Sequence, residues 1–214
     1  MCASRTSSGS RAGPVLRTAD GTALATRCWL LDEDADVIVV IAHGFTANKD
    51  DPSVVALAER LYQAGHEVVT YDSRGHGQSG GCCTLGKLEE QDVAAVVGWA
   101  RTRNECVVLV GASMGAVGVL AYAAKDADLM GVVTVSSPAG WRLPIRVRSL
   151  ITAAMARTPP GRRWAKRTMN VRIAPWASPE PARSHLGSVP CPVIVIHGRQ
   201  DPRSSRGSRV WPRR

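Results

Sequence analysis

The chain has 214 residues, 44% of them hydrophobic, and a formal net charge of +9. These values are typical of one globular domain with a sizeable buried core. No apolar run approaches the roughly 20 residues that cross a bilayer, and residues 1–14 lack the apolar core of a secretory signal. The sequence therefore predicts a cytoplasmic protein without a membrane span.

The positive charge is concentrated in segments rather than spread along the chain. Residues 141–189 hold ten basic residues and one acidic residue, whereas residues 19–140 hold twice as many acidic as basic residues. The overall basic charge therefore does not by itself indicate nucleic-acid binding. A basic surface that binds nucleic acid or anionic lipid is one alternative, although no recognised binding fold supports it.

Strand and helix patterns alternate along the chain. The β-branched run at residues 37–42 is typical of a strand buried on both faces of a parallel sheet. Together the patterns predict an α/β fold with a mostly parallel sheet and crossover helices. Strands are expected at residues 23–31, 37–42, 67–71, 106–110, 132–136 and 193–197, and helices at 52–64, 87–103 and 114–125.

The spacing of these elements predicts the domain organisation. The interval between the last two strands is too long for a plain connection, so we expect an inserted element with weak helical stretches around residues 146–157 and 163–171, broken by prolines. The expected parts are a disordered leader (1–18), an α/β core (19–137 and 190–201), a lid insertion (138–189) and a disordered basic tail (202–214).

The cysteines give no sign of a metal or redox site. None of the six has the spacing of a zinc finger or of a C-x-x-C motif, and no cluster of histidine, cysteine and aspartate has ligand spacing. The sequence therefore predicts no metal.

The strongest chemical signal is the run Gly111-Ala112-Ser113-Met114-Gly115, between a predicted strand and a predicted helix of small residues. Strand, Gly-x-Ser-x-Gly and helix together form the pattern of a nucleophile elbow. The two glycines leave room for strand and helix to approach, and the helix N-terminus directs N–H groups at a reacting carbonyl group. We therefore predict that Ser113 is a nucleophile. The alternative is a glycine-rich packing turn.

A second motif, His43-Gly44-Phe45, directly follows the buried strand at residues 37–42. With the elbow, it resembles the α/β-hydrolase superfamily, in which a His-Gly-x element supplies part of the oxyanion hole. The resemblance implies that the backbone N–H groups of Phe45 and Met114 hold the oxyanion. It also implies that His43 is a structural hydrogen-bonding residue and not the catalytic base.

A third motif follows the predicted strand at residues 67–71. It resembles the D-x-R-G-H-G-x-S loop of the monoacylglycerol-lipase-like and serine-aminopeptidase-like branch, which braces the floor of the active site. The resemblance implies structural hydrogen bonds for the aspartate and arginine, and a structural rather than catalytic histidine. The matching residues are Asp72, Arg74, Gly75, His76 and Gly77.

A fourth motif spans residues 190–201, an apolar strand followed by His-Gly-Arg-Gln-Asp. It is similar to the strand and loop that carry the catalytic acid in this superfamily, so the resemblance implies that Asp201 orients a catalytic histidine. The alternative for Asp201 is a surface turn residue. In the family the histidine follows the acid after one more helix and strand, but the 13 residues after Asp201 contain none. We therefore expect a C-terminal truncation or frameshift, with the last helix and strand missing.

The absence of that histidine raises the question of which base would activate Ser113. The resemblance gives His43, His76 and His197 structural places, and His66 opens a strand at the opposite end of the sheet. His185, in the inserted segment, is the remaining candidate for a replacement base.

The predicted function is a serine hydrolase of ester, thioester or small amide bonds, acting through a Ser113 acyl-enzyme on a small-molecule acyl substrate. Acyl transfer through serine requires no organic cofactor, and we expect no nucleic-acid partner. The alternative is a catalytically impaired or dead α/β-hydrolase fragment. The sequence carries no signal for the oligomeric state.

Overall fold

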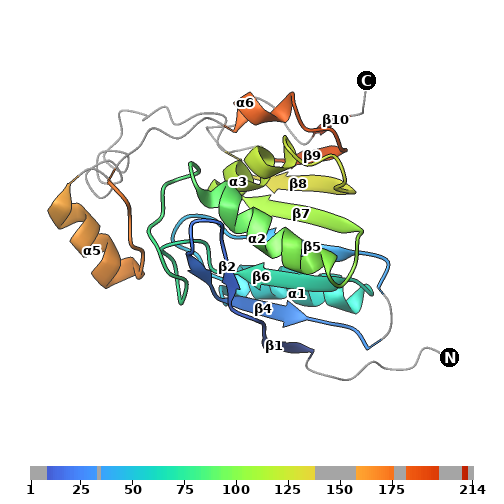
Figure 1. The fold of residues 1–214 in the computed structure, drawn as a ribbon, viewed down its shortest axis with the longest axis horizontal. Helices are drawn as coiled ribbons and strands as arrows, with labels where there is room; N and C mark the ends of the chain where they lie inside the picture. Colours follow the sequence, from blue (N-terminus) through green and yellow to red (C-terminus); the bar gives the residue numbers. More distant parts are fainter. Residues whose placement is uncertain (1–8, 33–34, 138–157, 176–181, 198–208, 212–214) are drawn as a thin grey trace.

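The computed structural model describes residues 9–32, 35–137, 158–175, 182–197 and 209–211. Within these ranges an eight-stranded sheet has the order β1-β4-β6-β5-β7-β8-β9-β10 (Figure 1). Its strands, in chain order, are β1 Ser10–Ala12, β4 Thr26–Trp29, β5 Ile38–Ala42, β6 Glu67–Tyr71, β7 Val107–Ala112, β8 Gly131–Val135, β9 Val193–Ile196 and β10 Arg209–Trp211. A separate pair joins β2 Leu16–Arg17 to β3 Ala23–Leu24.

The five central strands, β6, β5, β7, β8 and β9, run parallel to one another, and β1, β4 and β10 are antiparallel additions at the two edges. The helices are α1 Pro52–Gln63, α2 Glu89–Arg101, α3 Met114–Ala123, α5 Pro159–Met169 and α6 Arg183–Leu186. The predicted α/β fold with a mostly parallel sheet flanked by helices is confirmed. Because the central strands are parallel, their carboxyl ends meet at one edge, where the loops carrying functional residues lie.

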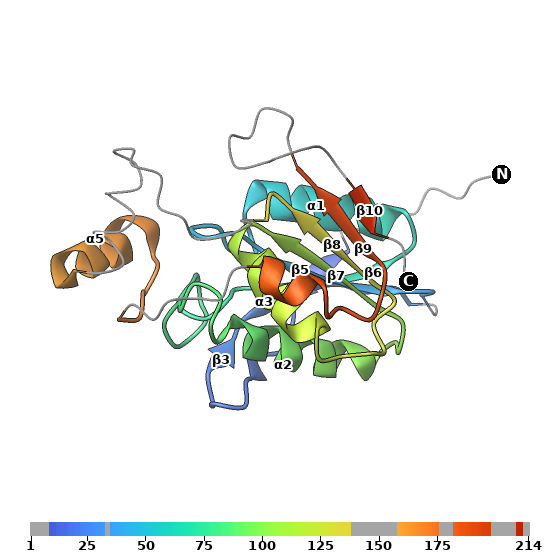
Figure 2. The same cartoon turned by 90° about the horizontal axis from the view of Figure 1, so that it is seen from above.

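Helices cover both faces of the sheet, and Figure 2 shows α1 on one side and α2 and α3 on the other. Successive residues of a strand point to opposite faces, so β5 contributes to two cores. Ile38 and Val40 pack in the core beneath α2 and α3, whereas Val39 and Ile41 pack in the core beneath α1. The strand at the centre of the sheet is therefore apolar at every position.

The helices begin and end for local reasons. Asp51 caps α1 by accepting a hydrogen bond from the Ser53 N–H at 3.0 Å, and Pro52 occupies the first turn, where its missing N–H has no cost. Prolines were expected to break the inserted segment, yet Pro159 and Pro160 open α5 for the same reason. No helix in the described ranges is both long and apolar enough to cross a membrane.

The two ends of the chain differ from the predicted disordered leader and tail. β1 and β2 lie within residues 1–18, and β1 pairs with β4 in the register Ser10 to Trp29. β10 lies within residues 202–214 and pairs with β9 in the register Arg209 to Val195. Pairing at a sheet edge uses backbone groups, so a polar sequence without strand periodicity still forms it. The predicted helical stretch at 146–157 lies outside the described residues.

Two helical glycines provide a stability prediction. A Cβ at exposed Gly98 in α2 would meet no atom within 4 Å, whereas a Cβ at Gly118 in α3 would lie 3.1 Å from Glu89 Cβ. We expect Gly98→Ala to raise the free energy of unfolding by about 0.5–1 kcal/mol, since alanine restricts the unfolded chain. Gly118→Ala should gain less or lose stability. Urea unfolding checks both, and an equal gain at the two positions would contradict the packing of α3 on α2.

Candidate active site

Ser113 lies between β7 and α3 in a strained backbone conformation. Its φ is 49° and its ψ is −111°, a combination that costs a non-glycine residue about 1–3 kcal/mol. The Ser113 N–H donates to the carbonyl oxygen of Val135 at 2.8 Å, which attaches the turn to the end of β8. The side chain makes no capping hydrogen bond to α3. The hydroxyl group is therefore held on a sharp turn without being used by the helix.

The two glycines of the elbow permit close packing that no larger residue allows. A Cβ at Gly111 would lie 2.6 Å from Ala116 Cα, inside the backbone of α3. A Cβ at Gly115 would lie 2.5 Å from the His43 carbonyl oxygen and would also overlap the Ala42 carbonyl oxygen. The N-terminus of α3 thus rests directly on the end of β5 and the start of the following loop.

That loop passes beside Ser113. A Cβ placed on Gly44 would lie 3.4 Å from Ser113 Cβ, so the two residues are in van der Waals range. Phe45 follows Gly44, and Met114 follows Ser113 as the first residue of α3. Within the described residues neither backbone N–H donates to a backbone acceptor, which for Met114 is expected of an N–H in the first turn of a helix. Two N–H groups without an acceptor therefore lie one residue from the contact between Gly44 and Ser113.

His43 is fully buried, and both ring nitrogens have partners. Nε2 accepts a hydrogen bond from the Ser73 N–H at 3.0 Å, so the proton is on Nδ1, which donates to the Gly44 carbonyl oxygen at 2.8 Å. Burial, together with the neighbouring His76, lowers the pKa of His43 to about 4. A neutral His43 thus joins the loop of Gly44 to the loop that follows β6.

The loop after β6 is organised by the buried carboxylate of Asp72. Asp72 Oδ1 accepts from the Lys49 N–H at 2.7 Å, and Oδ2 accepts from the Gln78 N–H at 2.8 Å. Lys49 Nζ lies 3.4 Å from Oδ2, so a charged partner accompanies the buried charge. Gly77 has a φ of 45°, and a Cβ there would overlap the Asp72 carboxylate. One carboxylate therefore fixes both of the loops that approach Ser113.

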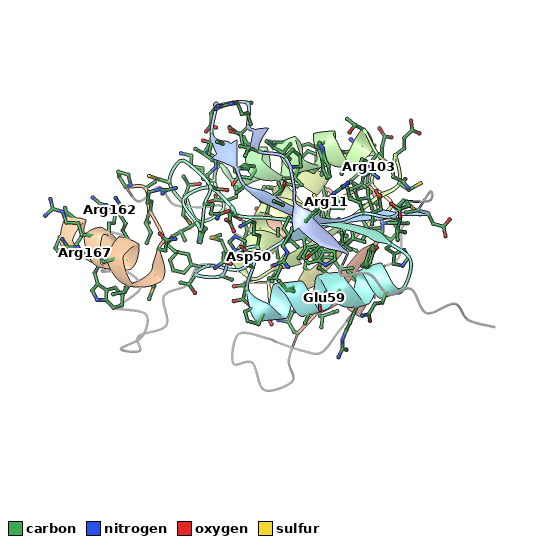
Figure 3. The ribbon with its side chains drawn as sticks, turned by 90° about the horizontal axis from the view of Figure 1, so that it is seen from below. Arg11, Asp50, Glu59, Arg103, Arg162 and Arg167 are labelled. Atoms are coloured by element: carbon green, nitrogen blue, oxygen red, sulfur yellow. The ribbon has the colours of Figure 1, made fainter. Side chains whose placement is uncertain are left out.

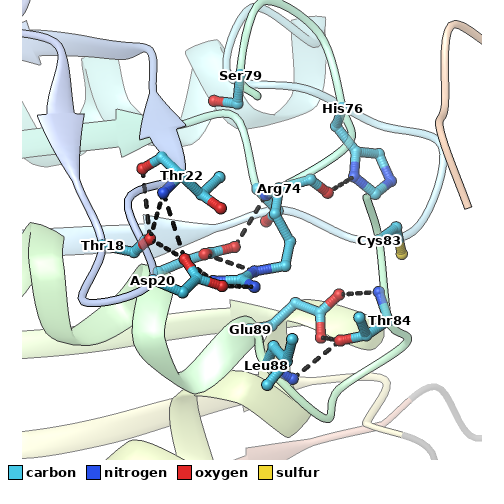
Figure 4. Close-up of polar contacts among 12 residues, drawn as sticks. Thr18, Asp20, Thr22, Arg74, His76, Ser79, Cys83, Thr84, Leu88 and Glu89 are labelled. Atoms are coloured by element: carbon cyan, nitrogen blue, oxygen red, sulfur yellow. Dashed lines mark hydrogen bonds and ion pairs between the residues drawn. The ribbon is translucent and has the colours of Figure 1, made fainter. Parts of the chain in front are cut away.

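Arg74 extends from the same loop between two acids (Figure 4). Its Nε donates to Asp92 Oδ1 in α2 at 2.8 Å, and its Nη1 donates to Asp20 Oδ2 at 2.8 Å. Hydrogen bonds from Thr18 and Arg74 lower the pKa of Asp20. Burial raises the pKa of Asp92 to about 7, although Arg74 opposes that shift. Arg74 thus connects the loop to α2 and to the turn between β2 and β3.

His76 is buried behind the loop of Gly44. Its Nδ1 lies 3.1 Å from the Arg74 carbonyl oxygen, and its Nε2 has no hydrogen-bond partner. The ring packs edge-on against Phe45, with centroids 5.9 Å apart, and against His43 at 5.0 Å. Burial lowers the pKa of His76. Its contacts support the position of Phe45 from behind.

Sequence reasoning missed a strap formed by residues 170–174 of the inserted segment. The Arg172 N–H donates to the Gly75 carbonyl oxygen at 2.8 Å, and the Cys83 N–H donates to the Arg172 carbonyl oxygen at 2.7 Å. The Arg172 guanidinium group donates to the carbonyl oxygens of Ser79 and, at 3.0 Å, Gly81. Gly75, with a φ of 75°, leaves no room for a side chain between these two backbones. No sequence motif marks this pairing, since its partners are far apart in the chain.

The remaining predicted residues are only partly placed. Asp201 lies outside the described residues. His185 is in α6, and no described histidine is hydrogen-bonded to Ser113. Among the described side chains, no group of three or more His, Cys, Asp or Glu residues is placed to hold a metal ion.

The overlap at Gly115 leads to a prediction about the elbow. In Gly115→Ala the new methyl group must displace α3 from the backbone at Ala42 and His43, so we expect a loss of about 1–3 kcal/mol in the free energy of unfolding. Urea unfolding measures it, with Gly98→Ala as the matched control in an open position. Unchanged stability in Gly115→Ala would show that the elbow is not packed this tightly.

The buried state of His43 predicts a pH dependence. The unfolded chain takes up a proton on this residue near pH 6.5, whereas the folded chain does so only near pH 4. The stabilisation is therefore present above pH 6.5 and is lost as the pH falls, by roughly 2 kcal/mol between about pH 7 and about pH 5. Urea unfolding at several pH values should show that the free energy of unfolding falls less steeply with decreasing pH in His43→Asn than in the wild type. If the variant lost stability as steeply as the wild type, the pH dependence would not come from His43.

Comparison with known proteins places this geometry in a family. The family model for serine aminopeptidase, S33, matches residues 33–183. A monoacylglycerol lipase of Mycolicibacterium smegmatis is 33% identical over 124 residues, which are 56% of this chain and 44% of that protein. An uncharacterised Escherichia coli protein is 28% identical over 105 residues, 45% of this chain and 36% of that one. The chain thus spans less than half the length of the curated relatives it matches.

Solved structures show the same fold. An esterase of Pyrococcus furiosus superposes with a TM-score of 0.69 at 23% identity, covering 90% of this chain and 71% of the esterase. A Butyrivibrio proteoclasticus protein, solved with ferulic acid bound, gives a TM-score of 0.65 at 21% identity, covering 89% and 80% of the two chains. With the family model matching well over half of its length, the chain belongs to the serine aminopeptidase S33 family of α/β-hydrolases.

Proposed function

We propose that the protein is a serine hydrolase that cleaves ester, thioester or small amide bonds through an acyl-enzyme on Ser113. The observation that carries the proposal is the strained Ser113 turn, with Gly44 in contact and α3 starting directly behind it. Strain at a nucleophile exposes its hydroxyl group, and the start of a helix supplies N–H groups and positive potential for the oxyanion.

The reaction divides into two acyl transfers. Ser113 Oγ attacks the carbonyl carbon, its proton passes to a base, and the carbonyl oxygen becomes an oxyanion held by the N–H groups of Phe45 and Met114. Collapse breaks the bond to the leaving group, which takes up the proton, and leaves an ester on Ser113. Water repeats the sequence and releases the acid. In this proposal Asp201 orients the base, and residues 138–189 cover the site as a lid.

The likeness to a monoacylglycerol lipase favours ester substrates with an acyl chain. The apolar cluster beside the elbow has the same implication, because Met114 packs there with Leu85 and Ile173, and Phe45 lies against it. Phe45 is the one of these four side chains that is not buried, so it is the part of the cluster that can contact the hydrocarbon part of a substrate.

A second candidate function is a catalytically impaired α/β-hydrolase. The observation that favours it is the lack of a hydrogen bond from Ser113 to any described histidine. Without a base a serine hydroxyl is a poor nucleophile, although oxyanion stabilisation and binding leave residual catalysis. The two candidates differ in whether Ser113 reacts.

The test is covalent labelling of the folded protein with a fluorophosphonate, together with hydrolysis of a short-chain nitrophenyl ester and of a monoacylglycerol. We expect labelling and turnover in the wild type, and a loss of at least about a thousandfold in Ser113→Ala. Ser188→Ala is the control, since Ser188 is exposed and away from the elbow. A folded wild-type protein that reacts no faster than Ser113→Ala would establish the impaired candidate instead.

A further inference from the structure

Helix α5 of the inserted segment carries the most concentrated charge in the described part of the chain. Its sequence, PPGRRWAKRTM, has four basic residues and no acidic one. Trp164, in the same helix, keeps 47% of its surface exposed. A large aromatic side chain among basic residues on an exposed helix is unusual, because the like charges repel one another and the exposed indole ring gains nothing from burial.

The packing of α5 determines which residues face outward. Ala165 is fully buried and Met169 is half-buried, both against the cluster that contains Leu85 and Met114. At 100° per residue, Arg163, Trp164 and Arg167 lie on the opposite side of the helix. Figure 3 shows the Arg162 and Arg167 side chains extending from α5 away from the sheet.

Three of the four basic side chains of α5 form no ion pair in the described part of the chain. They are Arg163, Lys166 and Arg167. Arg163 and Arg167 are four positions apart, where like charges on a helix repel each other. An anionic surface would relieve this repulsion. We call Arg163, Trp164, Lys166 and Arg167 the basic face of α5.

We propose that the basic face of α5 binds an anionic phospholipid surface. Lysine and arginine near such a surface are attracted to its headgroups, and a tryptophan among them inserts at the boundary between headgroups and acyl chains. Trp164 is the one exposed indole among the side chains that the structure describes. This favours lipid over nucleic acid, because sequence-independent nucleic-acid grooves use several aromatic side chains for stacking.

The location of α5 gives this contact a functional consequence. Figure 1 shows α5 beyond the edge of the sheet where β7 ends and α3 begins. Its buried side packs in the same cluster as Met114, and the strap at residues 170–174 fastens it to the loop of Gly75. A bilayer held by the basic face therefore lies across α5 from the cluster that contains Met114. The proposal concerns binding alone and does not require that Ser113 is reactive.

The test is co-sedimentation of the full chain with phospholipid vesicles at low and physiological ionic strength. We expect binding to phosphatidylcholine vesicles that contain phosphatidylglycerol, and little binding to phosphatidylcholine alone. Arg163→Gln/Arg167→Gln should bind roughly 30-fold more weakly, since each basic side chain near an anionic surface contributes a factor of about five. Binding should fall as salt is added.

The matched control is Arg60→Gln/Lys87→Gln, which removes the same charge from exposed positions on α1 and in a loop. This control should bind the vesicles as the wild type does. Trp164→Ala should lose the residual vesicle binding that the wild type keeps at high salt. Equal losses in the two double variants, or no preference for anionic vesicles, would overturn the proposal. So would a short DNA duplex that binds more tightly than the vesicles and depends on the same arginines. Fluorophosphonate labelling is scored separately, so failure of the proposed chemistry remains distinguishable.

Discussion

The close approach of α3 to the end of β5 is the constraint on which the rest of the site depends. Gly115 allows the first turn of the helix to rest on the backbone at Ala42 and His43, and Gly111 allows β7 to pass beneath Ala116. Only at this separation can the strained turn bring Ser113 into contact with Gly44. The proposed geometry of a nucleophile beside an oxyanion loop is thus a packing result, obtained by removing side chains rather than by adding polar contacts.

The loops around that contact are irregular, and buried polar groups hold them in place of secondary structure. Asp72 accepts from the backbone of both the loop after β5 and the loop after β6, and neutral His43 joins the same two loops. Arg74 then connects them to α2 through Asp92. Each of these groups is satisfied by neighbours from a different element, so removing one would leave a buried partner unpaired. Rigidity at the site therefore comes from the network and not from any one bond.

Local patterns in the sequence predicted the parts of this arrangement that local physics determines. The β-branched runs predicted the parallel strands, and glycines on either side of Ser113 predicted the elbow, because both reflect steric limits within a few residues. The Arg172 strap could not be predicted, since Arg172 meets the Gly81 carbonyl oxygen 91 residues away without any periodic signal. Asp92 has the pattern of an ordinary acid in the first turn of a helix, and only burial reveals its pairing with Arg74. The edge strands β1 and β10 could not be predicted for a different reason, because their pairing depends on backbone groups that every residue carries.

The inserted segment and the elbow are mechanically connected through one small apolar cluster. Met114 lies at the start of α3, and Ala165 belongs to α5, yet both are buried in the cluster with Cys83, Leu85 and Ile173. Close-packed interiors transmit displacement, so a shift of α5 must be accommodated at Met114 or by opening the cluster. Cys83 Sγ lies 3.5 Å from Met114 Sδ, so Met114 has little room to move toward Cys83. Whatever binds the outward side of α5 thus acts on the residue whose N–H is proposed to hold the oxyanion, which makes α5 a structural support of the proposed site.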